Sequence, residues 1–220
     1  MKLIIGNKAY SSWSLRGWLA CKQSGIPFEE VVVPLYDADW DRRREGDEFA
    51  PSSGKVPILW DGEAVVWDSL AIIEYLADKV GRDHFWPKDE AARAMARSMA
   101  AEMHSSFPNL RRKHAMNIRQ VFPARQPDDD VLIELHRLME LWAQARARWG
   151  GGGDFLFGEF GAADIMFAPV CTRLITYQLP VARFATPYIE AVLQHRWMQD
   201  WIAAAQEEDW VLEQYEQPAR

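Results

Sequence analysis

Cysteine and histidine are scarce in this sequence, and neither is spaced as a metal or redox site requires. Only two cysteines occur among 220 residues, Cys21 and Cys171, and no CxxC pair is present. The five histidines form no HxxxH pair and no HExxH motif, so we expect no metal site. Two distant cysteines without such a motif indicate reduced, buried thiols, as in a cytoplasmic protein.

Long apolar runs and clusters of positive charge are also absent. No stretch reaches the roughly 18 apolar residues of a membrane span, and residues 1–8 show neither the apolar core nor the cleavage site of a secretory signal. The formal net charge is -7, and the basic triplet at 42–44 lies among aspartates and glutamates. That pattern is typical of a solvated face. We therefore expect a cytoplasmic protein that binds neither nucleic acid nor membranes.

Apolar periodicity divides the chain into two parts, and the first, over 1–79, alternates short strands with helices. Asp61-Gly62 lies between two β-rich runs and predicts a tight hairpin. The first two strands can be parallel through a right-handed crossover, and the last two are antiparallel, which gives the order βαβαββα. Strands are expected over 2–5, 28–33, 56–60 and 64–67, and helices over 12–24, 39–48 and 69–80.

The second part, over 89–220, has helical periodicity throughout, which predicts an all-α domain. One long helix over 90–117 is expected to kink at Pro108, because proline removes a backbone donor. The glycines at 150–153 predict a loose loop. The other helices are expected over 128–149, 162–178, 187–194 and 197–207.

A proline stands inside one predicted strand, in the run GKVPIL over 54–59. Proline cannot donate to a strand ladder, but a cis Val56-Pro57 bond at the start of the strand removes the conflict. The Val56 amide and carbonyl would then be free to pair with an extended ligand. The alternative is a proline on an edge strand with no ligand.

Polar residues also stand at the starts of two predicted helices. Asp68 and Ser69 open the helix in WDSLAIIEYL, where unpaired N–H groups and the helix dipole favour an anion; Asp68 is also a good N-cap by itself. Ser11 and Ser12 follow the first strand in AYSSWSLRGWLA. These hydroxyls either cap the next helix or hold a reactive group.

These motifs together resemble the cytosolic glutathione transferases, over essentially the whole chain. The resemblance is carried by GKVPIL, by WDSLAIIEYL and by GAADIMFAP over 161–169, and SSWSLRGWLA is similar to the serine-type, zeta-like members. It implies a thioredoxin-like N-terminal domain over 1–79 and an all-helical domain over 89–220. It also implies glutathione as co-substrate, a small electrophile as second substrate, and a homodimer.

The resemblance assigns a role to each matching residue on the glutathione side. Val56, beside a cis Pro57, would bond the cysteinyl part of glutathione through its backbone. Asp68 would face the γ-glutamyl amino group, and Ser69 would take the neighbouring carboxylate. Lys55 would pair with the second carboxylate.

The same resemblance implies that Ser11 donates the catalytic hydrogen bond to the glutathione sulfur, with Ser12 and Tyr10 as alternatives. Such a bond stabilises the thiolate, which is the nucleophile. Trp13 stands where zeta-like members carry cysteine, which argues against the isomerase activity of that class. Asp164 would support a buried turn.

The electrophile pocket is expected to use residues from the first helix of the second part. Met103, His104, Phe107, Arg111 and Asn117 are the candidates, although core packing (Met103, Phe107) or a solvated surface (Arg111) is the better explanation for any one of them taken alone. Thiol–disulfide exchange is disfavoured because the strand-to-helix junction has no cysteine. A non-catalytic glutathione-binding or interaction protein is the alternative from another class.

Overall fold

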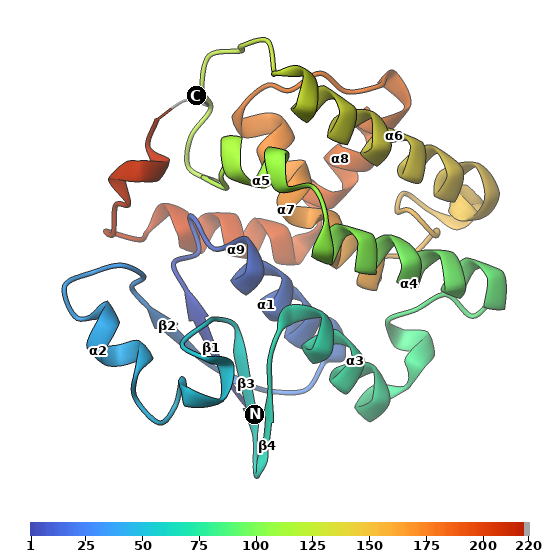
Figure 1. The fold of residues 1–220 in the computed structure, drawn as a ribbon. Coiled ribbons are helices and arrows are strands. Elements are labelled where there is room, and N and C mark those ends of the chain that lie inside the picture. Colours follow the sequence, from blue (N-terminus) through green and yellow to red (C-terminus); the bar gives the residue numbers. More distant parts are fainter. Residues whose placement is uncertain (218–220) are drawn as a thin grey trace.

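The computed structural model describes residues 1–217, so the last three residues of the predicted helical domain lie outside the described part. Figure 1 shows a sheet with its helices on one side of the molecule and a group of helices on the other. The sheet has the order β2-β1-β3-β4. Its strands are β1 Lys2–Gly6, β2 Glu29–Val33, β3 Ile58–Asp61 and β4 Ala64–Val66, and its helices are α1 Ser12–Ser24, α2 Trp40–Arg44 and α3 Ser69–Val80.

This sheet has the predicted βαβαββα topology. Strand β1 pairs in parallel with β2 and antiparallel with β3, and β4 is antiparallel to β3. Side chains alternate along β1: Leu3 and Ile5 join the main core, whereas Ile4 packs with Trp40 of α2 and Ile58 on the other face. This period of two fixes the register. The thioredoxin-like arrangement is therefore confirmed, with α2 shorter than expected.

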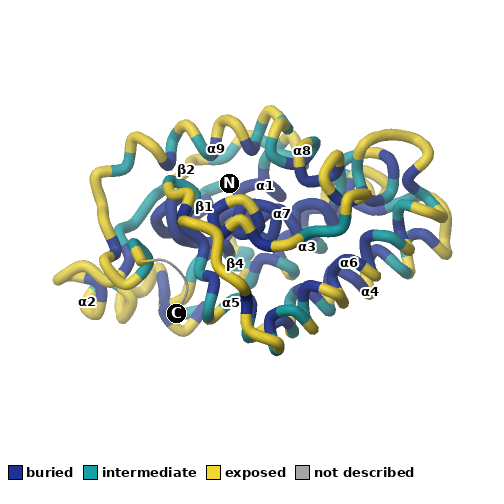
Figure 2. The backbone as a smooth tube through the Cα atoms, turned by 90° about the horizontal axis from the view of Figure 1, so that it is seen from above, coloured by how far each residue is buried: buried dark blue, intermediate teal, exposed yellow. Residues whose placement is uncertain are grey.

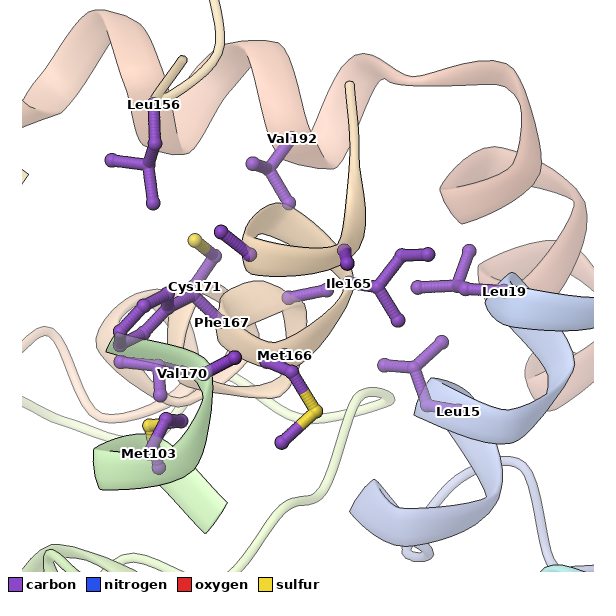
Figure 3. Packing of buried hydrophobic residues seen from close by; sticks show 14 of the residues in the cluster. Leu15, Leu19, Met103, Leu156, Ile165, Met166, Phe167, Val170, Cys171 and Val192 are labelled. Atoms are coloured by element: carbon purple, nitrogen blue, oxygen red, sulfur yellow. The ribbon is translucent and has the colours of Figure 1, made fainter. Parts of the chain in front are cut away.

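The second part is helical, as predicted. Its central helix, α7 (Ala162–Thr176), is buried along almost its whole length and packs against α1 of the first part. Figure 3 shows Leu15 and Leu19 of α1 beside Ile165 and Met166 of α7. The remaining helices are α4 Glu90–Ser105, α5 Pro108–Lys113, α6 Asp129–Trp149, α8 Thr186–Gln194 and α9 Arg196–Gln206.

Burial follows this arrangement. In Figure 2 the tube is mostly dark blue along α1 and α7, and outer helices such as α4 and α6 alternate between buried and exposed positions. Both Cys21 and Cys171 are free and buried, as predicted. No helix within residues 1–217 is long and apolar enough to cross a membrane. In the same residues there is no group of three His, Cys, Asp or Glu side chains that could hold a metal ion.

The predicted single helix over 90–117 is wrong. Helix α4 ends at Ser105, and Pro108 begins a separate helix, α5. Of the two residues between them, Phe107 takes a left-handed conformation with φ 63°. Proline disfavours helical geometry in the residue before it and fits the first position of a new helix, so the chain restarts here instead of kinking.

The loose loop predicted at 150–153 is also corrected. Gly150–Gly152 forms a 3-10 turn at the end of α6. Arg146 holds it, because its Nη1 donates to the Gly150 and Gly153 carbonyls at 3.1 and 2.7 Å. Asp164 supports the turn before α7 as predicted: its carboxylate accepts from the Leu156 and Gly161 amides at 3.1 and 2.9 Å.

Candidate active site

The junction between β1 and α1 is built around two hydroxyl groups. Ser11 is the N-cap of α1, and its Oγ accepts from the Ser14 amide at 3.3 Å. The Ser11 hydroxyl donates to Ser14 Oγ at 2.7 Å, and Ser14 Oγ also accepts from the Gly6 amide at 2.9 Å. The helix cap expected here is therefore present, and it ties the Ser11 hydroxyl to the end of β1.

The two neighbouring hydroxyl groups have other partners. Tyr10 donates to Glu216 and accepts from Arg119, and burial and Glu216 raise the pKa of its hydroxyl. Tyr10 therefore holds the C-terminal segment. Ser12 Oγ accepts from Arg173 Nη2 at 3.3 Å. Of the three candidates, Ser11 is the one whose hydroxyl bonds only to another serine within residues 1–217.

The segment before β3 leaves a peptide edge unpaired. The Val56-Pro57 bond is cis, and neither the amide nor the carbonyl of Val56 has a hydrogen-bond partner in the described chain. Pro57 lies directly against α1, because a Cβ placed on Gly17 would be 2.7 Å from Pro57 Cγ. Lys55 is exposed beside it. The free edge of Val56 is thus held close to the first helix.

The start of α3 carries a fixed carboxylate and an unused hydroxyl. Asp68 caps the helix, and its Oδ1 accepts from the Leu70 amide at 3.1 Å. Its Oδ2 lies 3.0 Å from Nε2 of His104, on α4. The Ser69 hydroxyl is buried and has no partner among the described residues. A carboxylate ligand would supply the acceptor that this hydroxyl lacks.

Trp13 joins the start of α1 to the helical part. Its ring lies edge-on to His104, with centroids 5.2 Å apart. The guanidinium carbons of Arg16 and Arg111 lie 4.9 and 5.1 Å from the ring centroid. The first turn of α1 and the α4–α5 corner therefore meet at Trp13, and His104 links them to the Asp68 cap of α3.

Two buried arginines make the base of this region cationic. Arg16 is fully buried; its Nε donates to the Met166 carbonyl at 3.0 Å, and neither Nη has a partner within the described part of the chain. Burial, with Arg111 and Arg173 nearby, lowers the pKa of Arg16, and burial with Arg111 lowers that of Arg173 to about 10. Neither arginine is assigned a role from the sequence, although Arg16 lies within SSWSLRGWLA and Arg173 is the one charge within CTRLIT.

The expected electrophile-pocket residues divide into two groups. Met103 and Phe107 are only 1% and 3% exposed and pack in the core, so they do not form an open wall. The Asn117 amide is committed to the C-terminal segment, since it donates to the Tyr215 carbonyl at 3.0 Å. His104 and Arg111 are the two that contact Trp13.

The fold and the site together define a two-domain protein, in which a thioredoxin-like part with a free peptide edge beside its proline is joined to an all-helical part. Residues 10–79 match the N-terminal domain of glutathione S-transferases and residues 129–205 match the C-terminal domain, together more than half of the chain. The chain belongs to the glutathione S-transferase family.

Individual relatives agree with this assignment. A zeta class glutathione S-transferase of Euphorbia esula is 29% identical, with 80% of this chain and 77% of the relative covered. Glutathione S-transferase GstB of Escherichia coli is 25% identical, with 73% and 77% covered. A crystal structure of a Burkholderia glutathione transferase homolog with bound glutathione superposes with a TM-score of 0.68 at 21% identity, covering 94% of this chain and 98% of that one.

Proposed function

We propose that the protein binds glutathione and transfers its thiolate to a small electrophile. The observation that carries the proposal is the unpaired peptide edge of Val56. An amide and a carbonyl on one residue can bond an extended peptide in antiparallel fashion, and the cysteinyl residue of glutathione is such a peptide. Glutathione is then the co-substrate, and the role needs no metal.

The ends of glutathione are assigned to the groups around that edge. Asp68 takes the γ-glutamyl ammonium, because its side chain is 48% exposed and retains acceptor capacity beyond its two bonds. The Ser69 hydroxyl and the free N–H groups of the first turn of α3 take the adjacent carboxylate. The exposed Lys55 takes the glycyl carboxylate.

Ser11 is proposed as the donor to the glutathione sulfur. Its proton is directed at Ser14 in the structure, but two hydroxyls can exchange donor and acceptor roles by rotation. With Ser14 donating to Ser11, the Ser11 proton is free for the sulfur, and Ser14 Oγ still accepts from the Gly6 amide. A donor stabilises the thiolate, and the buried cations Arg16 and Arg173 favour the same charge.

The electrophile is proposed to approach Trp13 on the side of His104 and Arg111, with Met103 and Phe107 packed behind them. Trp13 in place of a cysteine separates this site from zeta-type isomerases. Domain bounds of 1–79 and 89–220, a cytoplasmic location and a homodimer complete the proposal. A non-catalytic glutathione-binding role is the second candidate, because a thiol site alone does not prove turnover.

Calorimetric titration with glutathione, followed by conjugation assays on a panel of electrophiles, tests this proposal. Asp68→Asn keeps a good helix cap and removes the charge, so we expect glutathione affinity to fall about tenfold or more. Asp78→Asn removes a charge from an exposed position of the same helix, and should leave affinity unchanged. Binding without turnover would favour the second candidate, and no binding by the wild type would overturn both.

A further inference from the structure

The imidazole of His104 is held through Nε2 and through its ring, whereas its buried Nδ1 has no hydrogen-bond partner among residues 1–217. Its Nε2 meets Asp68 Oδ2 at 3.0 Å, and its ring stands at 82° to the Trp13 ring. Its backbone is also held, because Arg111 donates to the carbonyls of His104 at 3.3 Å and Ser106 at 2.9 Å. These contacts cap the end of α4, so the imidazole has little freedom to turn away from Asp68.

The Asp68 carboxylate is fixed in turn by two donors on different elements. Leu70 bonds Oδ1 from within α3, whereas His104 approaches Oδ2 from α4 of the helical part. One donor alone would leave the carboxylate free to rotate about its Cβ–Cγ bond. With both bonds made, its plane is set, and its exposed side presents the remaining lone pairs in one direction.

The type of residue at 104 matters for charge. A histidine can donate this bond from an uncharged imidazole, whereas lysine or arginine always brings a positive charge at neutral pH. Asp68 already lies within the field of the buried cation Arg16. An imidazole on Oδ2 therefore orients the carboxylate without the permanent positive charge that lysine or arginine would bring.

We propose that His104 is a positioning residue that makes the site selective for thiols carrying a free α-amino group, by orienting the Asp68 carboxylate from the helical domain. The inference rests on the proposed glutathione function and gives His104 a role on the thiol-substrate side in addition to its place beside Trp13. In this arrangement the helical domain contributes to recognition of glutathione as well as of the electrophile. Glutathione would be preferred over its deamino analogue, glutaryl-cysteinyl-glycine.

Two substitutions at this position separate positioning from packing. His104→Gln keeps an amide N–H near the place of Nε2 and should restore the bond to Asp68. His104→Phe keeps a ring that can pack against Trp13 and removes the donor. Circular dichroism and thermal unfolding would establish that both variants are folded.

The readout is the ratio of dissociation constants for glutathione and for its deamino analogue, measured by calorimetry. We expect the wild type to prefer glutathione by about 10- to 100-fold, as for a hydrogen bond to a charged group. In His104→Phe this preference should shrink about tenfold, and in His104→Gln it should stay within about twofold of the wild type. In steady state, His104→Phe should raise the KM for glutathione by a larger factor than it lowers kcat, because the ammonium contact is the same in ground and transition states.

The possible results distinguish this inference from the proposed function. An unchanged preference in His104→Phe, or equal weakening for both thiols, would overturn the positioning role while glutathione binding stands. A fall in kcat without a change in KM would place His104 at the chemistry and would also overturn it. If the wild type binds neither thiol, the proposed function itself fails, and this inference fails with it.

Discussion

Removal of the Ser11 hydroxyl should raise the pKa of bound glutathione thiol by about one to two pH units. A hydrogen bond to a charged group contributes roughly 1.5–3 kcal/mol, and one pH unit corresponds to about 1.4 kcal/mol. A free thiol titrates near 8.5, so only about 3% is thiolate at pH 7. With the Ser11 bond the pKa would fall to about 6.5–7.5, and a quarter or more of the bound thiol would be reactive.

The helix cap complicates the obvious substitution, because Ser11 Oγ also accepts from the Ser14 amide. Ser11→Ala removes both the thiol donor and the cap, and loss of the cap costs about 1 kcal/mol of stability. Ser11→Gly removes the same hydroxyl, but glycine at an N-cap costs only a few tenths of a kcal/mol. The two variants should therefore share one thiol pKa and differ in unfolding free energy.

The assay is the ultraviolet absorbance of bound thiolate as a function of pH, beside denaturant unfolding of each variant. Ser11→Thr, which keeps a hydroxyl and a cap, is the positive control. A thiol pKa that is the same in wild type, Ser11→Ala and Ser11→Gly would refute the assignment and move the role to Ser12. A pKa that follows stability instead of the hydroxyl would show that the cap, and not the donor, controls ionisation.

Three further predictions concern groups around the site. Tyr10→Phe should leave the thiol pKa unchanged and lower the free energy of unfolding by about 1–3 kcal/mol, because its hydroxyl bonds Arg119 and Glu216; denaturant unfolding and thiolate absorbance check both. Arg16→Met should raise the unfolding midpoint, since it removes a buried cation with unpartnered nitrogens, and should raise the thiol pKa; an unchanged midpoint and an unchanged pKa would contradict it. Burial raises the pKa of Asp164 to about 6, above about 3.9 in an unfolded chain. The folded protein therefore binds this proton more tightly, and stability should fall as pH rises from about 4 to 6. Asp164→Asn should abolish that slope in pH-dependent denaturant unfolding, and should lower stability at pH 7 by about 1–3 kcal/mol because one of two amide partners is lost.

The periodic elements could be predicted from the sequence because their patterns are local. The strand expected over 2–5, the Asp68 cap and the Asp61-Gly62 hairpin each depend on residues that are close together in the sequence. The break before α5 could not be fixed in the same way. A proline in a helical pattern is compatible with a kink or with a new helix, and the left-handed Phe107 that decides between them depends on the packing of the corner.

The residues of the candidate site also differ in whether a local pattern in the sequence could predict them. Motifs predicted Val56, Pro57, Asp68 and Ser11, since each belongs to a short run. The contact between Asp68 and His104 could not be predicted from the sequence, because His104 belongs to the other part of the chain and meets Asp68 only after the two parts pack. The Tyr10 hydroxyl bonds to a residue 206 positions away along the chain. No local pattern could therefore show that Tyr10, unlike Ser11, is occupied by a distant partner.

Gly17 is buried in α1, and its lack of a side chain affects where the Val56 edge lies. A methyl group there would lie 2.7 Å from Pro57 Cγ, well inside ordinary contact distance, so the loop that carries Val56 would have to move outward. The position of the Val56 edge relative to α1 therefore depends on the side chain that Gly17 lacks. A protein with alanine at this position would therefore hold the proposed peptide-binding edge in a different place, with every residue around that edge unchanged.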